Sequence, residues 1–140
     1  MTWQVWAVLS AVFAALTAIL AKVGVQYVNS DFATFIRTIV VLVALGAILV
    51  ATGQFQRLDS VPSRTYLFLG LSGLATGASW VCYFRALKLA NASLVAPIDK
   101  LSVVLVAILG VAFLGEKLLL RNWAGIILIA IGAVLVGMKP

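Results

Sequence analysis

Two adjacent charged residues, Asp99 and Lys100, lie inside a long apolar stretch and have the clearest potential for chemistry. A charge within an apolar span is costly, and it is by default a hypothesis of function. Arg37 enters another span from the same side, and we expect it to pair with Asp99, because adjacent residues on a helix do not face each other. Three alternatives remain open: a salt-bridge cluster that locks the helices, an electropositive vestibule for anionic or zwitterionic metabolites, and side chains that reach outward to the interface.

Aromatic residues lie close to these charges in the expected fold. Trp80, Phe84 and Lys88 follow each other at i, i+4 and i+8 and therefore share one helix face. With Tyr83 they could form an aromatic wall beside a cation, which suits flat or cationic ligands. The alternative is ordinary core packing. Thr76 could contact a ligand or bond its own helix backbone.

Other kinds of chemistry are poorly supported by the composition. The 140 residues include no histidine, one cysteine (Cys82) and four acids. Histidine catalysis, an intrachain disulfide and a cysteine metal site are therefore excluded. No nucleophile–base pair and no cofactor motif appears, so we predict no enzyme, no cofactor and no metal. The net charge of +6 is spread over short loops and does not indicate nucleic acid.

Five apolar stretches must position these residues. They cover about residues 3–21, 32–52, 66–84, 94–114 and 122–138, and each is long enough to cross roughly 30 Å of hydrocarbon as a helix. The chain is 64% hydrophobic and 10% charged, more apolar than a soluble domain can bury. We predict an all-α membrane protein, a bundle of five transmembrane helices in one domain (residues 1–140), multi-pass in the lipid bilayer of the bacterial cytoplasmic (inner) membrane.

Two helix starts affect the geometry of the charged residues. We expect Ser30 or Asp31 to cap the second span. Pro97 lacks an N–H, so it leaves the Ser93 carbonyl without its helical partner and permits a bend. We slightly favour Ser93 itself as the cap, in which case little is lost. If Asn91 is the cap instead, Pro97 lies deeper and a bend is expected.

The distribution of cations gives little instruction about orientation. An odd number of spans puts the termini on opposite faces, and an almost even split of Lys and Arg leaves the positive-inside rule little to act on. The sequence is therefore compatible with insertion both ways round, the alternative being one orientation fixed by a partner or by a slight excess. The side of the N-terminus carries Arg57, Arg64, Lys117 and Arg121, and the other side carries Lys22, Arg85, Lys88 and Lys139, joined by Arg37 and Lys100 if they reach outward.

Five short motifs occur in order along nearly the whole chain. They are AILAK (18–22), FIR (35–37), YFRAL (83–87), ASLVAP (92–97) and FLGEK (113–117). Their order and spacing resemble the EamA-type repeat of the drug/metabolite transporter superfamily. The resemblance implies a five-helix repeat in which inverted pairs form an exporter of metabolites or drugs. Most relatives carry two fused repeats, whereas this chain has one.

From these observations we expect half of an inverted-repeat transporter that is completed by a second copy of itself. It would export a small metabolite or drug-like molecule by alternating access. The alternatives are a lipid-carrier flippase, since anionic head groups suit basic sites, and a non-transporting membrane scaffold subunit. The residues that we expect to bind substrate are, in order, Lys100, Asp99, Arg37, Trp80 and Tyr83.

Small residues indicate where helices could approach closely. Gly125 and Gly132 lie seven residues apart in the fifth span, and this stripe resembles the helix-pairing glycines of the small multidrug resistance family. We expect it at the dimer interface, the alternative being close packing within one subunit. Glu116 is expected to be architectural, paired with Lys117 or Arg121 or acting at the start of the fifth span.

Overall fold

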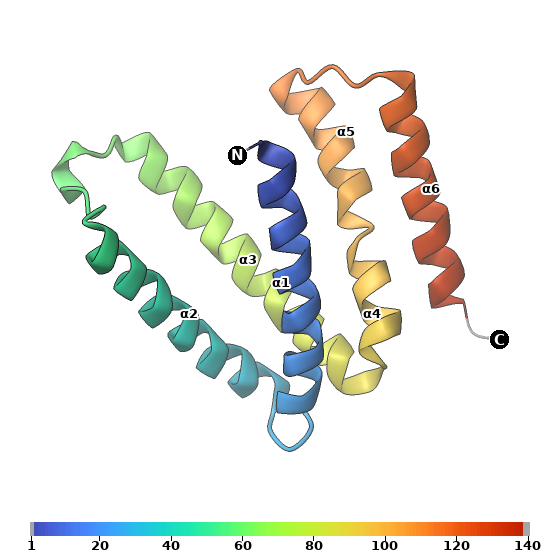
Figure 1. The fold of residues 1–140 in the computed structure, drawn as a ribbon, viewed down its shortest axis with the longest axis horizontal. Helices are drawn as coiled ribbons and strands as arrows, with labels where there is room; N and C mark the ends of the chain where they lie inside the picture. The colour runs from blue at the N-terminus through green and yellow to red at the C-terminus, as the bar shows by residue number, and fades with distance from the viewer. Residues whose placement is uncertain (1, 139–140) are drawn as a thin grey trace. The chain divides into compact units, whose positions relative to one another are not determined.

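The computed structural model describes residues 2–138, which form helices joined by short turns (Figure 1). Five segments are long and apolar enough to cross a membrane, and no strand occurs in this described part of the chain. The predicted all-α fold with five membrane-spanning helices is therefore confirmed. In order, the elements are α1 (Trp3–Gly24), α2 (Ser30–Thr52), the 3-10 helix η1 (Leu58–Ser60), α3 (Ser63–Leu89), α4 (Ala92–Asp99), α5 (Ser102–Leu114) and α6 (Leu120–Gly137).

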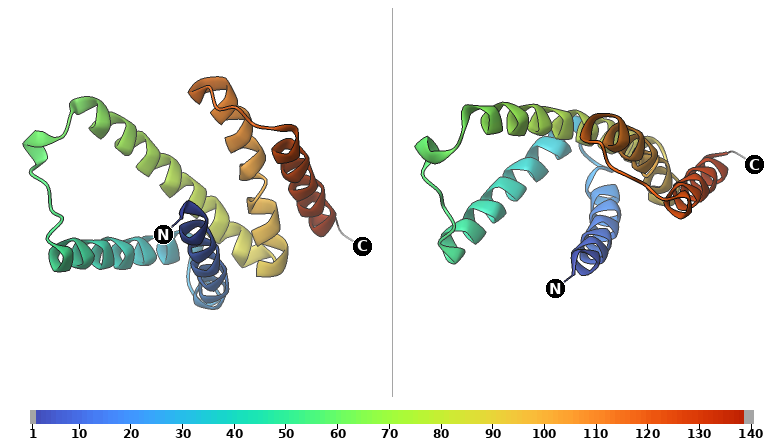
Figure 2. Two further views of the ribbon diagram at one scale, coloured as in Figure 1. Left: turned by 45° about the horizontal axis from the view of Figure 1, so that its top comes forward. Right: turned by 90° about the horizontal axis from the view of Figure 1, so that it is seen from above.

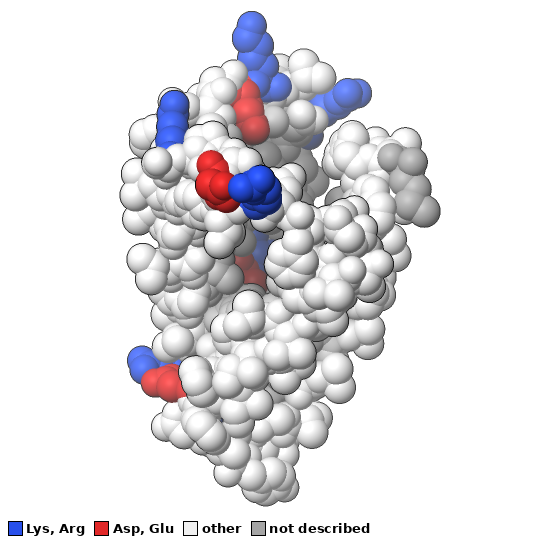
Figure 3. All heavy atoms as spheres, turned by 90° about the vertical axis from the view of Figure 1, so that its left-hand side faces the viewer, with Lys and Arg blue, Asp and Glu red and all other residues white. Residues whose placement is uncertain are grey.

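The surface of the helices is apolar. Large side chains such as Leu42 and Leu74 are more than 70% exposed, and on the face drawn in Figure 3 charged side chains occupy only small, separate areas. Such a surface is unfavourable in water and matches a hydrocarbon environment. Lipid, more than a protein core, is therefore the solvent of these side chains.

Contacts divide the chain into two units, which are described separately. In the unit that includes residues from Leu89 onward, α6 lies beside α4 and α5 (Figure 2). In the unit Ala21–Lys88, α2 and α3 meet where α2 begins and α3 ends, and they diverge towards η1 (Figures 1 and 2). One group of charged residues of this unit, which includes Asp31 and Arg85, lies where the two helices meet.

The N-cap of α2 is Asn29, so the expected cap at Ser30 or Asp31 is wrong. The Asn29 side-chain oxygen accepts hydrogen bonds from the backbone N–H groups of Asp31 (2.8 Å) and Phe32 (3.2 Å). A capping residue needs an extended backbone, and Asn29 has one, with φ −61° and ψ 135°. Ser30 is already the first helical residue, and its carbonyl accepts a bond from the Thr34 hydroxyl.

Glycines in the left-handed conformation end α2 and α5. Gly53 has φ 64° and Gly115 has φ 67°, values that other residues adopt only at a cost. The Gly53 N–H donates to the carbonyl of Val50 and so satisfies a group that the ending helix leaves free. This conformation turns the chain sharply out of the membrane-spanning helix.

Replacing Gly53 with alanine should lower the free energy of unfolding by about 1–2 kcal/mol, the cost of a left-handed non-glycine residue. Gly46 offers a matched control, because it lies inside α2 and a methyl group there meets no heavy atom within 4 Å. Gly46→Ala should cause no loss of stability. Loss of helicity during titration from mild detergent into sodium dodecyl sulfate measures both variants, and equal destabilisation would contradict the role given to Gly53.

Candidate functional site

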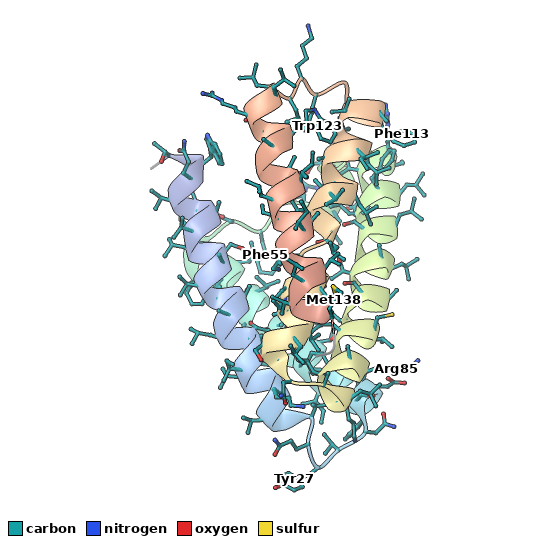
Figure 4. All side chains as sticks on the ribbon, turned by 90° about the vertical axis from the view of Figure 1, so that its right-hand side faces the viewer. Tyr27, Phe55, Arg85, Phe113, Trp123 and Met138 are labelled. Carbon is teal, nitrogen blue, oxygen red and sulfur yellow. The ribbon has the colours of Figure 1, made fainter. Side chains whose placement is uncertain are left out.

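One end of the unit Ala21–Lys88 is held by a set of charged side chains that we call the polar latch: Lys22, Asp31, Arg85 and Lys88. Arg85, labelled in Figure 4 near the end of α3, donates through Nε to Asp31 Oδ1 (2.9 Å) and through Nη2 to Asp31 Oδ2 (2.6 Å). Two parallel bonds fix both the distance and the orientation of the pair. Asp31 lies in the first turn of α2, where the helix dipole favours a negative charge.

Both lysines of the polar latch bind backbone carbonyls. Lys22 Nζ donates to the Leu87 carbonyl (2.6 Å), and Lys88 Nζ donates to the carbonyl of Val28 in the turn between α1 and α2. Carbonyls at a helix C-terminus lack intrahelical partners, so a lysine there satisfies an otherwise free group. Together with the Arg85–Asp31 pair, these bonds hold the polar end of α3, which continues to Leu89, beyond the predicted end at residue 84.

Arg37 is the cation that lies against the aromatic wall. Its guanidinium carbon is 4.2 Å from the centroid of the Trp80 ring and 5.6 Å from that of Phe84. The shared face of Trp80 and Phe84 was predicted, but the cation beside it is Arg37 and not Lys88. Tyr83, also half-buried, lies close enough to Arg37 for an electrostatic interaction.

Phe84 is the residue of this site that our predicted list lacks. The residue is 3% exposed, and its ring forms the second contact of the guanidinium. The i, i+4 spacing from Trp80 was the available signal for it. The expected pairing of Arg37 with Asp99 stays a prediction, because the two residues belong to different units.

The fourth span is broken next to its charged residues. Asn91 is the N-cap of α4, so the favoured cap at Ser93 is wrong and Pro97 lies inside the helix. After Pro97 the bonds tighten: Lys100 N–H donates to the Ala96 (3.3 Å) and Pro97 (3.1 Å) carbonyls. The α-helix resumes only at Ser102. The span thus breaks shortly after Pro97, at Lys100 and Leu101, and the Asn91 alternative had predicted a bend in this region.

Asp99 and Lys100 pair with each other at this break, contrary to our expectation. Lys100 Nζ lies 3.5 Å from Asp99 Oδ2, and the side chains are 55% and 39% exposed, respectively. Adjacent residues diverge in a regular helix, but Lys100 is the residue at which α4 ends. The break therefore brings together two charges within a span and leaves both accessible.

The predicted interface glycines make no close contact within their own unit. A methyl group added at Gly125 or Gly132 meets no heavy atom within 4 Å, so the small size of these residues has no use there. Their role at a dimer interface stays a prediction. The same openness holds at Gly73 and Gly77 of α3.

Two polar side chains have local roles. Glu116 lies against Gly110, with Oε2 2.6 Å from the position that a methyl group on Gly110 would take. Among the described residues it forms no ion pair with Lys117 or Arg121. The Thr76 hydroxyl donates to the Ser72 carbonyl of its own helix, which was the alternative to a ligand contact.

Five spans, a proline-broken helix with accessible charges and a cation against aromatic rings define a multi-pass membrane protein with polar groups inside its spans. The model of the EamA-like transporter family matches residues 1–138, and the chain belongs to this family. A protein from Sinorhizobium sp. named "Uncharacterized transporter in cobO 3'region" is 64% identical over 137 residues, which cover 98% of this chain and 97% of that protein. No solved structure matches. The expected family is thus confirmed, and the protein is a membrane transporter.

The contact between α4 and α6 can be tested at Gly137. A methyl group there would lie 2.8 Å from Ile98 Cδ1 and 3.2 Å from Cγ1, closer than carbon atoms normally pack. We expect Gly137→Ala to cost about 1 kcal/mol of unfolding free energy, because the end of a flexible side chain must shift. Ile98→Val removes the nearer atom and should recover part of this loss. Simple additivity of the two changes in a double-mutant cycle, measured by detergent unfolding, would contradict the contact.

Proposed function

We propose that this membrane transporter is a homodimer of oppositely oriented copies in the bacterial cytoplasmic membrane. It acts as a secondary transporter and exports a small metabolite by alternating access. The observation that carries the proposal is the presence of five spans in a single repeat. Many transporters place their substrate path between two inverted repeats, and since one repeat is present here, a second, inverted copy would supply the other half.

The distribution of charge supports two orientations. Arg57, Arg64, Lys117 and Arg121 lie in or next to turns on the side of the N-terminus, against Lys22, Arg85 and Lys88 on the other. Lys139, which also counts on the second side, lies outside the described residues. Such a balance leaves neither side with the clear excess that fixes orientation.

The break in the fourth span supports a substrate path. Discontinuous helices that carry polar groups near the middle of the membrane are a recurrent way to build transporter binding sites. Lys100 and Asp99 lie at the break, and they are the residues of this unit that we propose to contact the substrate. In the unit Ala21–Lys88 the proposed contacts are Arg37, Trp80 and Tyr83. A non-transporting scaffold predicts that Asp99 and Lys100 pair with no water-sized cavity beside them. The two do pair, at 3.5 Å, so it is the broken helix and not the pair that favours transport.

The interface proposed for the second copy is the glycine stripe of α6. Gly125 and Gly132 present a surface with no side chains and no close neighbour in their own unit. Small residues at this spacing let two helices approach closely in a membrane, where packing and not hydrophobic burial drives association.

Orientation should respond to single-side changes of charge. We expect reporters fused to the C-terminus of the unaltered protein to be active on both sides of the membrane: green fluorescent protein in the cytoplasm and alkaline phosphatase outside. The double variant Lys117→Gln/Arg121→Gln leaves the other side with the excess of cations. Since the C-terminus shares that other side, fluorescence should rise and phosphatase activity should fall.

The matched variant Lys88→Gln/Lys139→Gln should shift both signals in the opposite direction. A C-terminal signal on one side only, in the unaltered protein and in both variants, would sink the antiparallel dimer.

Lys100→Ala should abolish export while the amount of protein in the membrane stays unchanged, because a charge inside a span is retained for function. The readout is the set of compounds enriched in the medium of cells that produce the protein, compared with cells that do not. Gln56→Ala, a change in the exposed loop after α2 that leaves the balance of charge intact, serves as the control and should preserve the enrichment. Undiminished enrichment in Lys100→Ala would reduce this residue to a packing role.

A further inference from the structure

The acids of the unit Ala21–Lys88 form no ion pair with Arg37. Asp31 binds Arg85, Asp59 lies 3.2 Å from Arg57, and Asp99 lies 3.5 Å from Lys100. The fourth acid, Glu116, lies beside Gly110 after α5. Within Ala21–Lys88 no acceptor of a hydrogen bond from the Arg37 guanidinium is found.

The Arg37 side chain does not extend towards the membrane surface but stays at the depth of Trp80. The Arg85–Asp31 pair marks the level at which α3 and α2 meet. Counted from it, Arg37 lies six residues into α2 and Trp80 five residues into α3, about 9 Å and about 8 Å deeper at 1.5 Å per residue. Phe84 is only one residue from that level. The guanidinium is closer to the Trp80 ring than to the Phe84 ring, so it stays at depth.

Stacking on aromatic rings leaves the hydrogen-bonding groups of the guanidinium unused. A ring contacts the flat face, whereas all five N–H groups lie in the plane and point outward from its edge. The side chain is half-buried, so part of it is accessible. Cation–π attraction offsets only part of the cost of a charge within a span. The arrangement is a preformed fork for two oxygens of one anion.

We propose that Arg37, held against Trp80 and Phe84, binds the carboxylate or phosphate group of the transported substrate, which is therefore a small organic anion with an apolar body. The inference rests on the proposed transport function and names its substrate class. A bidentate pair with an oxyanion supplies the charge and the acceptors that the unit Ala21–Lys88 lacks at this point. An apolar body suits the surrounding rings, whereas a bare inorganic ion would lose its hydration without compensation.

Fluorescence of Trp80 offers a direct test on the full-length protein. The chain has four tryptophans, and replacing Trp3, Trp6 and Trp123 with phenylalanine leaves Trp80 as the only reporter. The protein is purified in an uncharged detergent and titrated with benzoate or with benzyl alcohol, which has the same ring without the charge. We expect a saturable change with benzoate and none with the alcohol.

Variants of Arg37 and a matched arginine complete the test. Arg37→Gln should weaken benzoate binding about tenfold or more, the effect of losing charge-assisted hydrogen bonds. Arg37→Lys should weaken it less, because the charge remains while the fork is lost. Arg64 also lies over an aromatic ring, 5.6 Å from the centroid of Phe68 at the other end of α3, so Arg64→Gln should leave binding unchanged.

A second measurement needs no variant. Phenylglyoxal modifies accessible guanidinium groups, and benzoate should protect Arg37 but not Arg64 from it, as read by peptide mass spectrometry. If Arg37→Gln fails to fold, protection of Arg37 alone supports the proposal, and equal modification with and without benzoate overturns it.

Four results would overturn the proposed anion site. They are an equal response to benzyl alcohol, unchanged affinity in Arg37→Gln, a response only when phosphatidylglycerol vesicles are added, and benzoate binding that appears only in Asp99→Asn. The third would assign Arg37 to a lipid phosphate, and the fourth would make Asp99 its occupant.

The outcome is distinguishable from failure of the dimer. Binding in detergent does not depend on orientation, so a one-sided C-terminal reporter together with intact benzoate binding would remove the antiparallel pair and keep the anion site. The opposite combination would keep the pair and remove the anion site.

Discussion

The structure depends on one constraint: within hydrocarbon, every backbone N–H and C=O must find its partner inside the protein. Helices meet this demand locally, which is why five apolar segments adopt them. Other kinds of hydrogen bond occur where a backbone group has no partner within its own helix. Helix ends are completed by the Asn29 side chain, by left-handed glycines and by two lysines of the polar latch. The single interruption within a span in the described chain lies at Lys100 and Leu101, three residues after Pro97, a residue without a donor.

The charged side chains differ in the same respect, because some have hydrogen-bonding partners within their unit and others do not. In the unit Ala21–Lys88, the end where α2 and α3 meet carries a two-bond ion pair and two lysine-to-carbonyl bonds, so its polar groups are satisfied. Arg37, deeper in the same unit, has aromatic rings in place of a carboxylate. The first arrangement holds helices together. The second leaves hydrogen-bonding capacity for a molecule that comes from outside, and this difference separates architecture from the proposed binding site.

The spans could be predicted because length and hydropathy decide them, whereas their ends and contacts could not. Asn29 is the N-cap of α2 because its backbone is extended. Asn29, Ser30 and Asp31 are all residue types that can cap a helix, and the sequence does not show which of them has the extended backbone. The helix α3 outruns its apolar stretch because Arg85 has Asp31 as a partner 54 positions away. Whether the fourth span bends near Pro97 could not be decided without knowing whether Asn91 or Ser93 is the N-cap of this helix. Arg37 and Trp80 were both singled out, but their contact depends on the crossing of two helices, which no local pattern encodes.

The two ends of α2 are held by different physics. At Gly53 the chain turns through backbone conformation alone, while at the other end charged groups of the polar latch hold the turn. Dissolved ions weaken exposed charge pairs but leave a backbone dihedral untouched. In a pair of inverted subunits, each side of the membrane would therefore face the polar latch of one subunit and the Gly53 turn of the other. In the proposed pair, a change of salt on a single side of the membrane would act on the polar latch of one subunit only, so each subunit could be weakened separately from its own side.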